Sequence, residues 1–420
     1  MAKIHEKKTV PVYLLIVLTL SLSFSLSPCT GADLLEVLCS GHTGSMPLMA
    51  QLLGREPMTE VTVIPTRIHG VTEVTPEKVR RYMRLYFPRT YEALIEGYEF
   101  LLLRGIDCTY FTARQLEWMR RAIEEDGIGG LQDRSVMSSN TAYAEPWSES
   151  STSRAFPNDA EAVVAVDYTK HGSMEVIMNE DQEIPPIFTP YGELLEYQIG
   201  SGGYTMMIPK EGATTYMSAR IPSYSEFAYP EPGVFPHTLG WRYGEGYTWS
   251  LMDYSGSGFW GQAKNPYGMD AYLGMLMHST GRKLPGDVVT VHRLRINYHR
   301  YAEQKGFIYS MISFVERFGA NTQELEEEIG EMDREWKQSR DLYLGQDYPS
   351  ATEILDRILA EIEKLRGEAL KTKDRALLWI YLIEWLAVTG TALVSAFAVW
   401  TLMVRRRLYR EVEATRLTQR

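Results

Sequence analysis

The feature that most constrains this chain is an apolar stretch near its C-terminus, ALLWIYLIEWLAVTGTALVSAFAVWTLMV, at residues 376–404. It is longer than the roughly 20 residues that an α-helix needs to cross the hydrocarbon core of a bilayer. Its one charged residue is Glu384, and the basic cluster RRRLYR follows directly. Because arginines beside a span mark its cytoplasmic end, the sequence predicts a transmembrane helix at 376–404, held by the lipid bilayer, and a cytoplasmic basic tail at 405–420.

The other end of the chain has the pattern of a secretory signal peptide. Lysines precede the apolar run VPVYLLIVLTLSLSFSLS, and the small residues Gly31 and Ala32 follow it. This order of basic, apolar and small residues is typical of such peptides, although an uncleaved N-terminal anchor is the alternative. With a signal peptide at 1–32, we expect a single-pass protein of the cell membrane, with its N-terminal domain outside and its C-terminus in the cytoplasm.

Charge and cysteine content narrow the classes of partner and fold. The formal net charge of −11 argues against nucleic acid, because binding a polyanion needs a clustered positive surface. Three cysteines do not form a disulfide framework. Cys29 falls within the predicted signal peptide, which leaves Cys39 and Cys108 in the folded region.

Alternating strand and helix patterns follow the signal peptide. DLLEVLCSG, EVTVIP, YEFLLLRGID and IGGL are short apolar runs that end in turn residues, as buried strands do. FTARQLEWMRRAIEEDG places Leu116, Met119 and Ile123 on one helical face and ends at Gly127. This alternation favours a parallel sheet covered by helices on both faces.

Beyond about residue 160 the pattern becomes richer in strands. The expected strands are AEAVVAVDY, GYTMMIP, TTYMSARI and FPHTLGWRYGEGYTWSLMDY, and DAYLGMLMHSTGRKLP is expected to be a closing helix that ends at Gly281. The fold class expected is therefore α/β, with β-rich additions to a parallel sheet.

Residues 288–375 are expected to form a helical membrane-proximal region. Asp287 can cap its first helix, Asn321 with Glu324 resembles a capping box, and Ser350 with Glu353 resembles another. Apolar residues then recur at helical spacing, and we expect them to form the core of a helical hairpin rather than a face that binds a partner. They are Leu325, Ile329, Met332, Trp336, Leu355, Ile358, Ile362 and Leu365.

Residues 33–287 resemble the class I glutamine amidotransferase-like family, in its divergent, membrane-anchored branch. The resemblance is carried by EVLCSGHTGSM, by YEFLLLRGIDCTYFTARQLEWMRRAIEEDGIGGLQDRSVMS, by PWSESSTSRAFPNDAEAV, and by WRYGEGYTWSLMDYSGSGFW with NPYGMDAYLGMLMHSTGR. It implies a flavodoxin-like, doubly wound parallel sheet, in which ligands bind outside the carboxyl ends of the strands.

The same resemblance implies that the family's catalysis is missing. Its enzymes place a cysteine on the elbow after the strand that IGGL matches, where this chain has Gln132 and Asp133. They also supply a His-x-Glu pair, which the predicted external region lacks. We therefore expect a degenerate domain that binds a ligand or partner, without metal or cofactor. The predicted ligand-binding residues are Ser40, His42, Asp107, Gln132, Asp133 and Arg134.

Two alternatives remain open on the residues. Cys39 or Cys108 with His42 as base would make a cell-surface thiol hydrolase or transferase, whereas buried thiols or a disulfide would make neither cysteine reactive. The same His42 and Cys108, with Asp107, could bind a metal only if the fold brought them together. A structural subunit of an envelope complex is the other alternative. A membrane protein partner or homodimer is compatible with the spacing of Ala392 and Ala396 in the span.

Overall fold

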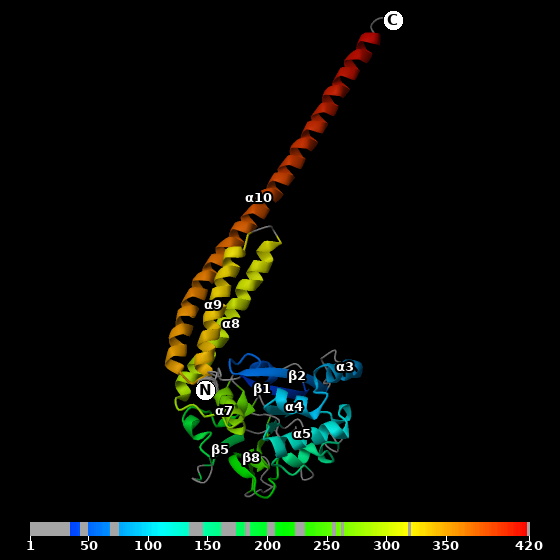
Figure 1. The fold of residues 1–420 in the computed structure, drawn as a ribbon. Helices are drawn as coiled ribbons and strands as arrows, with labels where there is room; N and C mark the ends of the chain where they lie inside the picture. The colour runs from blue at the N-terminus through cyan, green and yellow to red at the C-terminus, as the bar shows by residue number, and fades with distance from the viewer. Residues whose placement is uncertain are drawn as a thin grey trace, which may run out of the picture. The chain divides into compact units, whose positions relative to one another are not determined.

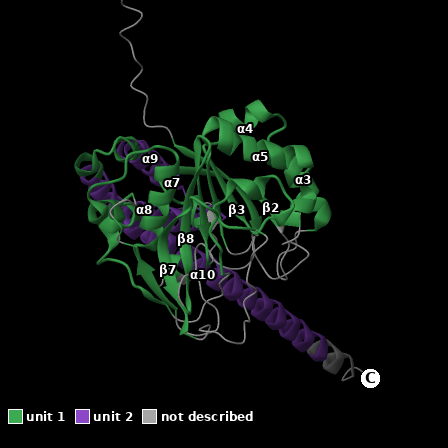
Figure 2. Cartoon of the chain, turned by 90° about the horizontal axis from the view of Figure 1, so that it is seen from below, with its two compact units in different colours: residues 1–295, 340–351 green, residues 296–339, 352–420 purple. Residues whose placement is uncertain are grey.

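The computed structural model describes residues 34–42, 49–67, 75–133, 146–160, 174–179, 181, 185–199, 206–222, 232–253, 258–261, 264–317 and 321–417. The chain divides into two compact units, shown in different colours in Figure 2. Unit 1 is Met1–Arg295 with Arg340–Ala351, and unit 2 is Ile296–Ser339 with Thr352–Arg420. The predicted signal peptide at 1–32 and the predicted site residue Arg134 lie outside the described residues.

Unit 1 is built on a nine-stranded sheet with the strand order β2-β1-β3-β4-β9-β8-β7-β5-β6. The strands are β1 (Leu35–His42), β2 (Thr59–Arg67), β3 (Phe100–Arg104), β4 (Gly129–Gln132), β5 (Met174–Met178), β6 (Gln198–Ile199), β7 (Thr214–Arg220), β8 (Val234–Tyr243) and β9 (Gly246–Leu251). The helices are α2 (Met49–Leu53), α3 (Pro76–Tyr86), α4 (Tyr91–Gly97), α5 (Ala113–Asp126) and α7 (Gly268–Ser279). Short 3-10 helices lie at η1 (Cys108–Tyr110), η3 (Thr152–Ala155), η5 (Thr189–Tyr191) and η7 (Gly258–Trp260).

The sheet is mixed. Strands β2, β1, β3, β4 and β9 pair in parallel, and β9, β8, β7, β5 and β6 pair antiparallel. The predicted α/β class with β-rich additions is therefore confirmed, as one continuous mixed sheet. The carboxyl ends of the parallel strands share one edge, which is where such sheets place their ligands.

Local sequence explains the helices that flank this sheet. Thr112 and Gln115 cap α5 reciprocally, Gly127 ends it with φ of 76°, and Leu116, Met119 and Ile123 are buried as the spacing predicted. Helix α7 is apolar nearly all round and is buried along most of its length, as expected for a helix within a core. Its chain leaves through Gly281, as predicted, with φ of 66°.

One predicted strand was wrong, and another is not tested by the described residues. Of the expected strand GYTMMIP, the described part is not a strand, and Pro209 forms an isolated bridge with Asn158. The expected strand AEAVVAVDY falls almost wholly outside the described residues.

The predicted caps of the last two helices are displaced by a few residues. Helix α9 (Gln323–Leu344) begins after Thr322, so Asn321 and Glu324 do not form the expected capping box. Helix α10 (Tyr348–Leu417) begins after Asp347, whose carboxylate accepts from the Ser350 amide at 3.3 Å. Asp287, in contrast, precedes α8 (Val288–Glu316) and accepts from the Thr290 amide at 3.0 Å, as expected of a cap.

Unit 2 is formed by the long helices α8, α9 and α10, which run side by side around one apolar core (Figure 1). Most residues of the predicted apolar stripes lie in or against this core, so the prediction of a helical core is confirmed, although three helices form it and not the expected hairpin. Its buried members are Tyr301, Ile308, Ile312, Leu325, Ile329, Met332, Ile358, Ile362, Leu365 and Ala369. The hydroxyl groups of Tyr298 and Ser339 lie 2.7 Å apart and add a buried hydrogen bond between α8 and α9.

The C-terminal part of α10 fits a single-pass membrane protein. Among the described residues it is the helix that is long and apolar enough to cross a bilayer, with a mean hydropathy of 1.8 in its best window. Its large apolar side chains are exposed, for example Trp385 at 71% and Val394 at 71%. An exposed apolar surface of this kind is compatible with lipid, which removes the cost of contact with water.

Candidate functional site at the carboxyl ends of the strands

Buried polar side chains gather where the parallel strands end. Arg104 closes β3, Gln132 closes β4 and Asp133 follows it, while Ser250 lies near the end of β9. All four are at most 6% exposed. Because a buried polar group without a partner is costly, the contacts of each decide what it can do.

Arg104 and Asp133 form a buried ion pair between neighbouring strands. Arg104 Nε lies 3.0 Å from Asp133 Oδ2, with the two side chains 7% and 0% exposed. Gly41, at the end of β1, lies directly against this arginine: a Cβ built on it would be 1.9 Å from the Arg104 carbonyl oxygen. Gly41 also has φ of 135°, which other residues rarely adopt. The ends of β1 and β3 are thus held close together.

Gln132 belongs to a separate hydrogen-bonded group. Its Nε2 donates to Ser250 Oγ at 2.7 Å and to Asn158 Oδ1. Ser250 Oγ in turn donates to Asn158 Oδ1 at 2.9 Å. Gln132 and Ser250 are fully buried and Asn158 is 1% exposed. The elbow position is therefore occupied by an amide whose side chain is held by its neighbours, and an amide is not a nucleophile.

A histidine of β8 and an aspartate that follows β9 lie together at the end of this strand pair that is away from its connecting turn. His237 Nε2 is 3.5 Å from Asp253 Oδ1, and Asp253 Oδ2 accepts from the Phe259 amide at 2.9 Å. His237 Nδ1 lies 2.9 Å from Thr238 Oγ1, and its ring stacks on Trp260 at 6.0 Å between centroids. The sequence patterns indicated neither this pair nor Arg104, Asn158 and Ser250 as site residues. Asp253 could have been found, because it follows the end of a central strand by two residues.

Both cysteines of the folded region are free and buried, so the disulfide considered above is not formed. Burial raises the pKa of the Cys39 thiol to about 12, with Arg104 opposing and Asp133 adding to the shift. Burial, and then the charge of Asp107, raises the pKa of Cys108 to about 12. Since the thiolate is the nucleophile, neither environment favours thiol catalysis near neutral pH.

The remaining predicted ligand-binding residues have local roles. Ser40 Oγ lies 3.4 Å from both the Ile64 carbonyl and Thr66 Oγ1, and therefore links β1 to β2. Asp107 caps a 3-10 turn by accepting from the Thr109 amide at 3.0 Å. Of His42, the backbone in β1 is described but not the side chain. Of the predicted site residues, Asp133 forms an ion pair with Arg104, and Cys39 lies close enough to Arg104 for its charge to act on the thiol. Gln132 instead belongs to the hydrogen-bonded group of Ser250 and Asn158.

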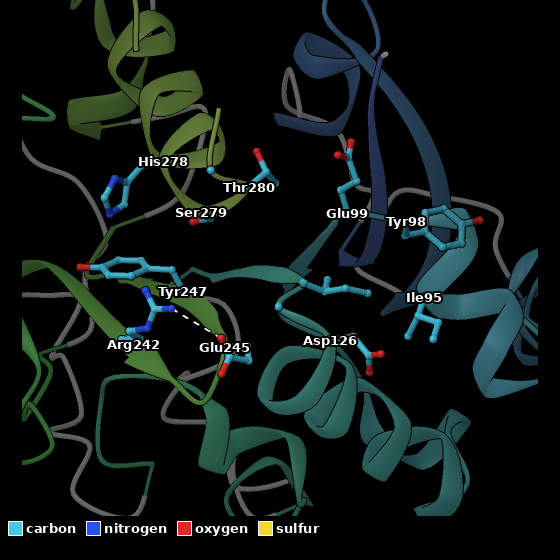
Figure 3. Close-up of a pocket in the computed structure, with 13 residues that line it drawn as sticks. Ile95, Tyr98, Glu99, Asp126, Arg242, Glu245, Tyr247, His278, Ser279 and Thr280 are labelled. Carbon is cyan, nitrogen blue, oxygen red and sulfur yellow. Dashed lines mark ion pairs between the residues drawn. The ribbon is translucent and has the colours of Figure 1, made fainter. Parts of the chain in front are cut away.

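A cavity of about 440 Å³ lies at the opposite, amino-terminal edge of β3, β4 and β9 (Figure 3). His278 and Thr280 at the end of α7 line it together with Tyr247 and Arg242 of the β8–β9 hairpin, and the His278 ring packs edge-on against Tyr247 with centroids 4.7 Å apart. Burial, and then the charge of Arg242, lowers the pKa of His278. Ligands of open α/β sheets bind at the carboxyl ends of the strands. We therefore place the candidate site at the carboxyl ends, around Arg104 and Gln132, and not at this cavity.

No group of three or more His, Cys, Asp or Glu side chains with metal-binding geometry occurs in the described ranges. The alternative metal site of His42, Cys108 and Asp107 stays untested, because the His42 side chain is not described. The carboxylates of the site instead pair with protein side chains, Asp133 with Arg104 and Asp253 with His237.

Comparison with known proteins gives distant structural likenesses. No protein-family model and no curated protein matches the chain. Two cytoplasmic proteins of Salmonella typhimurium are similar in structure, at 14% and 13% identity and TM-scores of 0.41 each, over 58% of this chain and 99% of theirs. The exo-beta-1,4-mannosidase Op5Man5 of Opitutaceae bacterium strain TAV5 matches at 12% identity and a TM-score of 0.29, over 59% of this chain and 36% of its own. None of the three is described as a glutamine amidotransferase.

Proposed function

We propose that this chain is a membrane-anchored binding protein whose unit 1 recognises a ligand or partner without catalysing amidotransferase chemistry. The observation that carries the proposal is Gln132, at the position where the resembling family has its nucleophile. Its amide is fully buried and hydrogen-bonded to Ser250 and Asn158. An enzyme nucleophile needs an adjacent base and access to its substrate, and this side chain has neither.

The family assignment is part of the proposal. The five parallel strands in the order β2-β1-β3-β4-β9 support a degenerate, flavodoxin-like version of the class I glutamine amidotransferase fold. In this version the antiparallel strands β8, β7, β5 and β6 extend the sheet beyond β9. The polar strand-end residues then stabilise the sheet edge on which a ligand would be bound.

The proposed topology places unit 1 outside the cell. It rests on the apolar part of α10, on the arginines that follow it, and on the signal-like residues 1–32. A protease added to intact cells should then remove unit 1 and leave an epitope on the tail at 405–420 intact. Protection of the whole chain would rule out this orientation.

Catalysis and thiol reactivity are tested together on the full chain in lipid nanodiscs. Ammonia release from glutamine should equal the rate without protein, and alkylation of Cys39 and Cys108 at neutral pH should be slow until the chain is unfolded. The matched variants Cys39→Ser and Cys108→Ser assign any labelling to one thiol. Ammonia release that is lost in Gln132→Ala would overturn the proposal.

The thiol enzyme and the structural subunit remain the competing functions. Rapid alkylation of one native cysteine, abolished by His42→Ala, would favour the thiol hydrolase or transferase. Stoichiometric co-purification of another membrane protein, lost when the exposed face of α8 or α9 is changed, would favour a subunit of an envelope complex.

A further inference from the structure

A second cavity of unit 1, of about 600 Å³, lies between α3, the segment that follows it, η1 and α5, away from the strand ends. Arg80 and Arg84 of α3, Arg89 before α4, and Arg114 in the first turn of α5 line it. Among the described residues, no Asp or Glu lines it. We call these residues and this cavity the arginine pocket. A volume of this size is in the range of small-ligand sites, roughly 300–1,000 Å³.

The positive charge of the arginine pocket is not balanced within the described chain. None of the four arginines lies within 4.0 Å of a described carboxylate oxygen. Arg80 acts electrostatically on Glu77, but hydrogen bonds at the start of α3 are the larger causes that lower the pKa of Glu77. Elsewhere in unit 1, Arg104, Arg120, Arg121, Arg282 and Arg295 all pair with carboxylates. The four pocket arginines differ from these five in having no carboxylate partner among the described residues, although the chain has a net charge of −11.

Two features of this placement are electrostatically unfavourable, although the helix dipole favours Arg84 in the last turn of α3. Arg80 and Arg84 are four residues apart on α3, and like charges at this spacing repel each other on a helix. Arg114 lies in the first turn of α5, where the positive end of the helix dipole disfavours a cation. A bound anion would relieve both repulsions at once.

The floor of the arginine pocket is apolar and buried. Met83, Phe87 and Trp118 line it and are each at most 8% exposed. Phe87 packs edge-on against Phe111 with centroids 5.6 Å apart, and the Arg114 guanidinium lies 4.8 Å from the Trp118 ring centroid. Guanidinium groups present planar pairs of donors that match carboxylate and phosphate oxygens. Donors from three separate elements can contact more than one such group.

We propose that the arginine pocket binds a small anion with two or more phosphate or carboxylate groups. This site is distinct from the strand-end edge and goes beyond the proposed function, which would stand if this pocket bound nothing. Phosphate and carboxylate ligands share the same recognition by arginine, so the choice between them is left to the probes used.

Isothermal titration of the full chain in zwitterionic lipid nanodiscs, at about 0.15 M salt, tests the site with pyrophosphate, citrate and acetate. We expect saturable one-site binding of pyrophosphate or citrate, and binding of the monovalent acetate at least about tenfold weaker. Arg84→Gln and Arg114→Gln should each weaken binding by about tenfold, as the loss of a charge-assisted hydrogen bond does. Binding of one probe alone identifies its chemical class as the preferred one.

Arg81→Gln is the matched control, because Arg81 is exposed on the same helix but does not line the pocket. It removes the same charge and should change the affinity by less than about twofold, because salt at this concentration screens the attraction of charges that do not contact the anion. Equal weakening by Arg81→Gln and Arg84→Gln would show diffuse attraction and overturn the proposal. The absence of saturable binding of both pyrophosphate and citrate would also overturn it. The unfolding temperature of each variant verifies that it is folded.

Discussion

Arg295 binds the Glu56 carboxylate through two nitrogens of its guanidinium, across a sequence separation of 239 residues. Arg295 Nε donates to Glu56 Oε2 at 2.7 Å, and Nη2 donates to Oε1 at 2.6 Å. The third nitrogen, Nη1, lies 2.5 Å from Asp270 Oδ1. All three side chains are at most 3% exposed, so one cation is held between two carboxylates away from water, and Asp270 Oδ2 also lies 2.7 Å from His292 Nδ1. This triad joins α7, the start of α8 and the loop before β2 within unit 1.

Removing the cation of this triad should be strongly destabilising. Arg295→Met leaves the carboxylates of Glu56 and Asp270 buried beside each other, which costs about 3–5 kcal/mol in comparable buried pairs. Arg295→Lys keeps the charge but loses the planar fork, so an intermediate loss is expected. Urea unfolding of the full chain in nanodiscs measures both. Arg293→Met, at an exposed position of the same helix, is the control and should change stability by less than about 0.5 kcal/mol. A similar effect of both Met variants would contradict this role of the triad.

Gly41→Ala should prevent close pairing of β1 with β3. The added Cβ would lie 1.9 Å from the Arg104 carbonyl oxygen, and φ of 135° disfavours any side chain. Because the obstacle is backbone, we expect a loss of several kcal/mol, of the order found for severe core overpacking. Gly97→Ala is the matched control, since nothing lies within 4 Å of its added Cβ. The yield and unfolding temperature of folded protein compare the two, and equal behaviour would mean that the sheet edge relaxes.

Periodic and local features of unit 1 could be predicted from the sequence, whereas contacts between distant segments could not. Leu116, Met119 and Ile123 lie on a buried face because helical spacing alone determines which residues share a face. Asn158 meets Gln132 only because a loop 26 residues later returns to the end of β4. No local pattern contains that information.

The same distinction explains the missed histidine. His237 is in the middle of β8, where its buried neighbours Phe235 and Leu239 give the pattern of an ordinary core strand. Its partner Asp253 comes from the next strand end, and the pair forms only when β8 and β9 fold back on each other. The predicted caps at Asn321 and Ser350 were displaced for a simpler reason. Thr322 and Asp347 are equally good caps nearby, and the choice between neighbouring caps depends on packing.

The core of unit 2 should be sensitive to small cavities. Ile308 is fully buried among α8, α9 and α10, and Ile308→Ala is expected to cost about 2–5 kcal/mol. Ile296, on the same helix, is 50% exposed, so Ile296→Ala should cost less than about 1 kcal/mol. Hydrogen exchange detected by mass spectrometry resolves the amides of α8 and α9 from those of unit 1. Equal protection of these helices in the two variants would mean that the three helices do not share this core.

His278 should make the stability of unit 1 depend on pH. Burial, and then the charge of Arg242, lowers its folded-state pKa below the ordinary value of 6.5. Between the two pKa values the unfolded chain binds more protons than the folded one, so stability rises with pH in that interval. The stability that neutral His278 allows is fully present above the unfolded-state pKa of about 6.5, and it is lost as the pH falls from there through the folded-state pKa. Measuring unfolding free energies from pH 5 to 8 for the wild type and His278→Gln isolates this residue, because other titrating groups cancel in the difference. The wild type should lose more stability on acidification than the variant does, and a difference that stays constant across the range would exclude His278 as the cause.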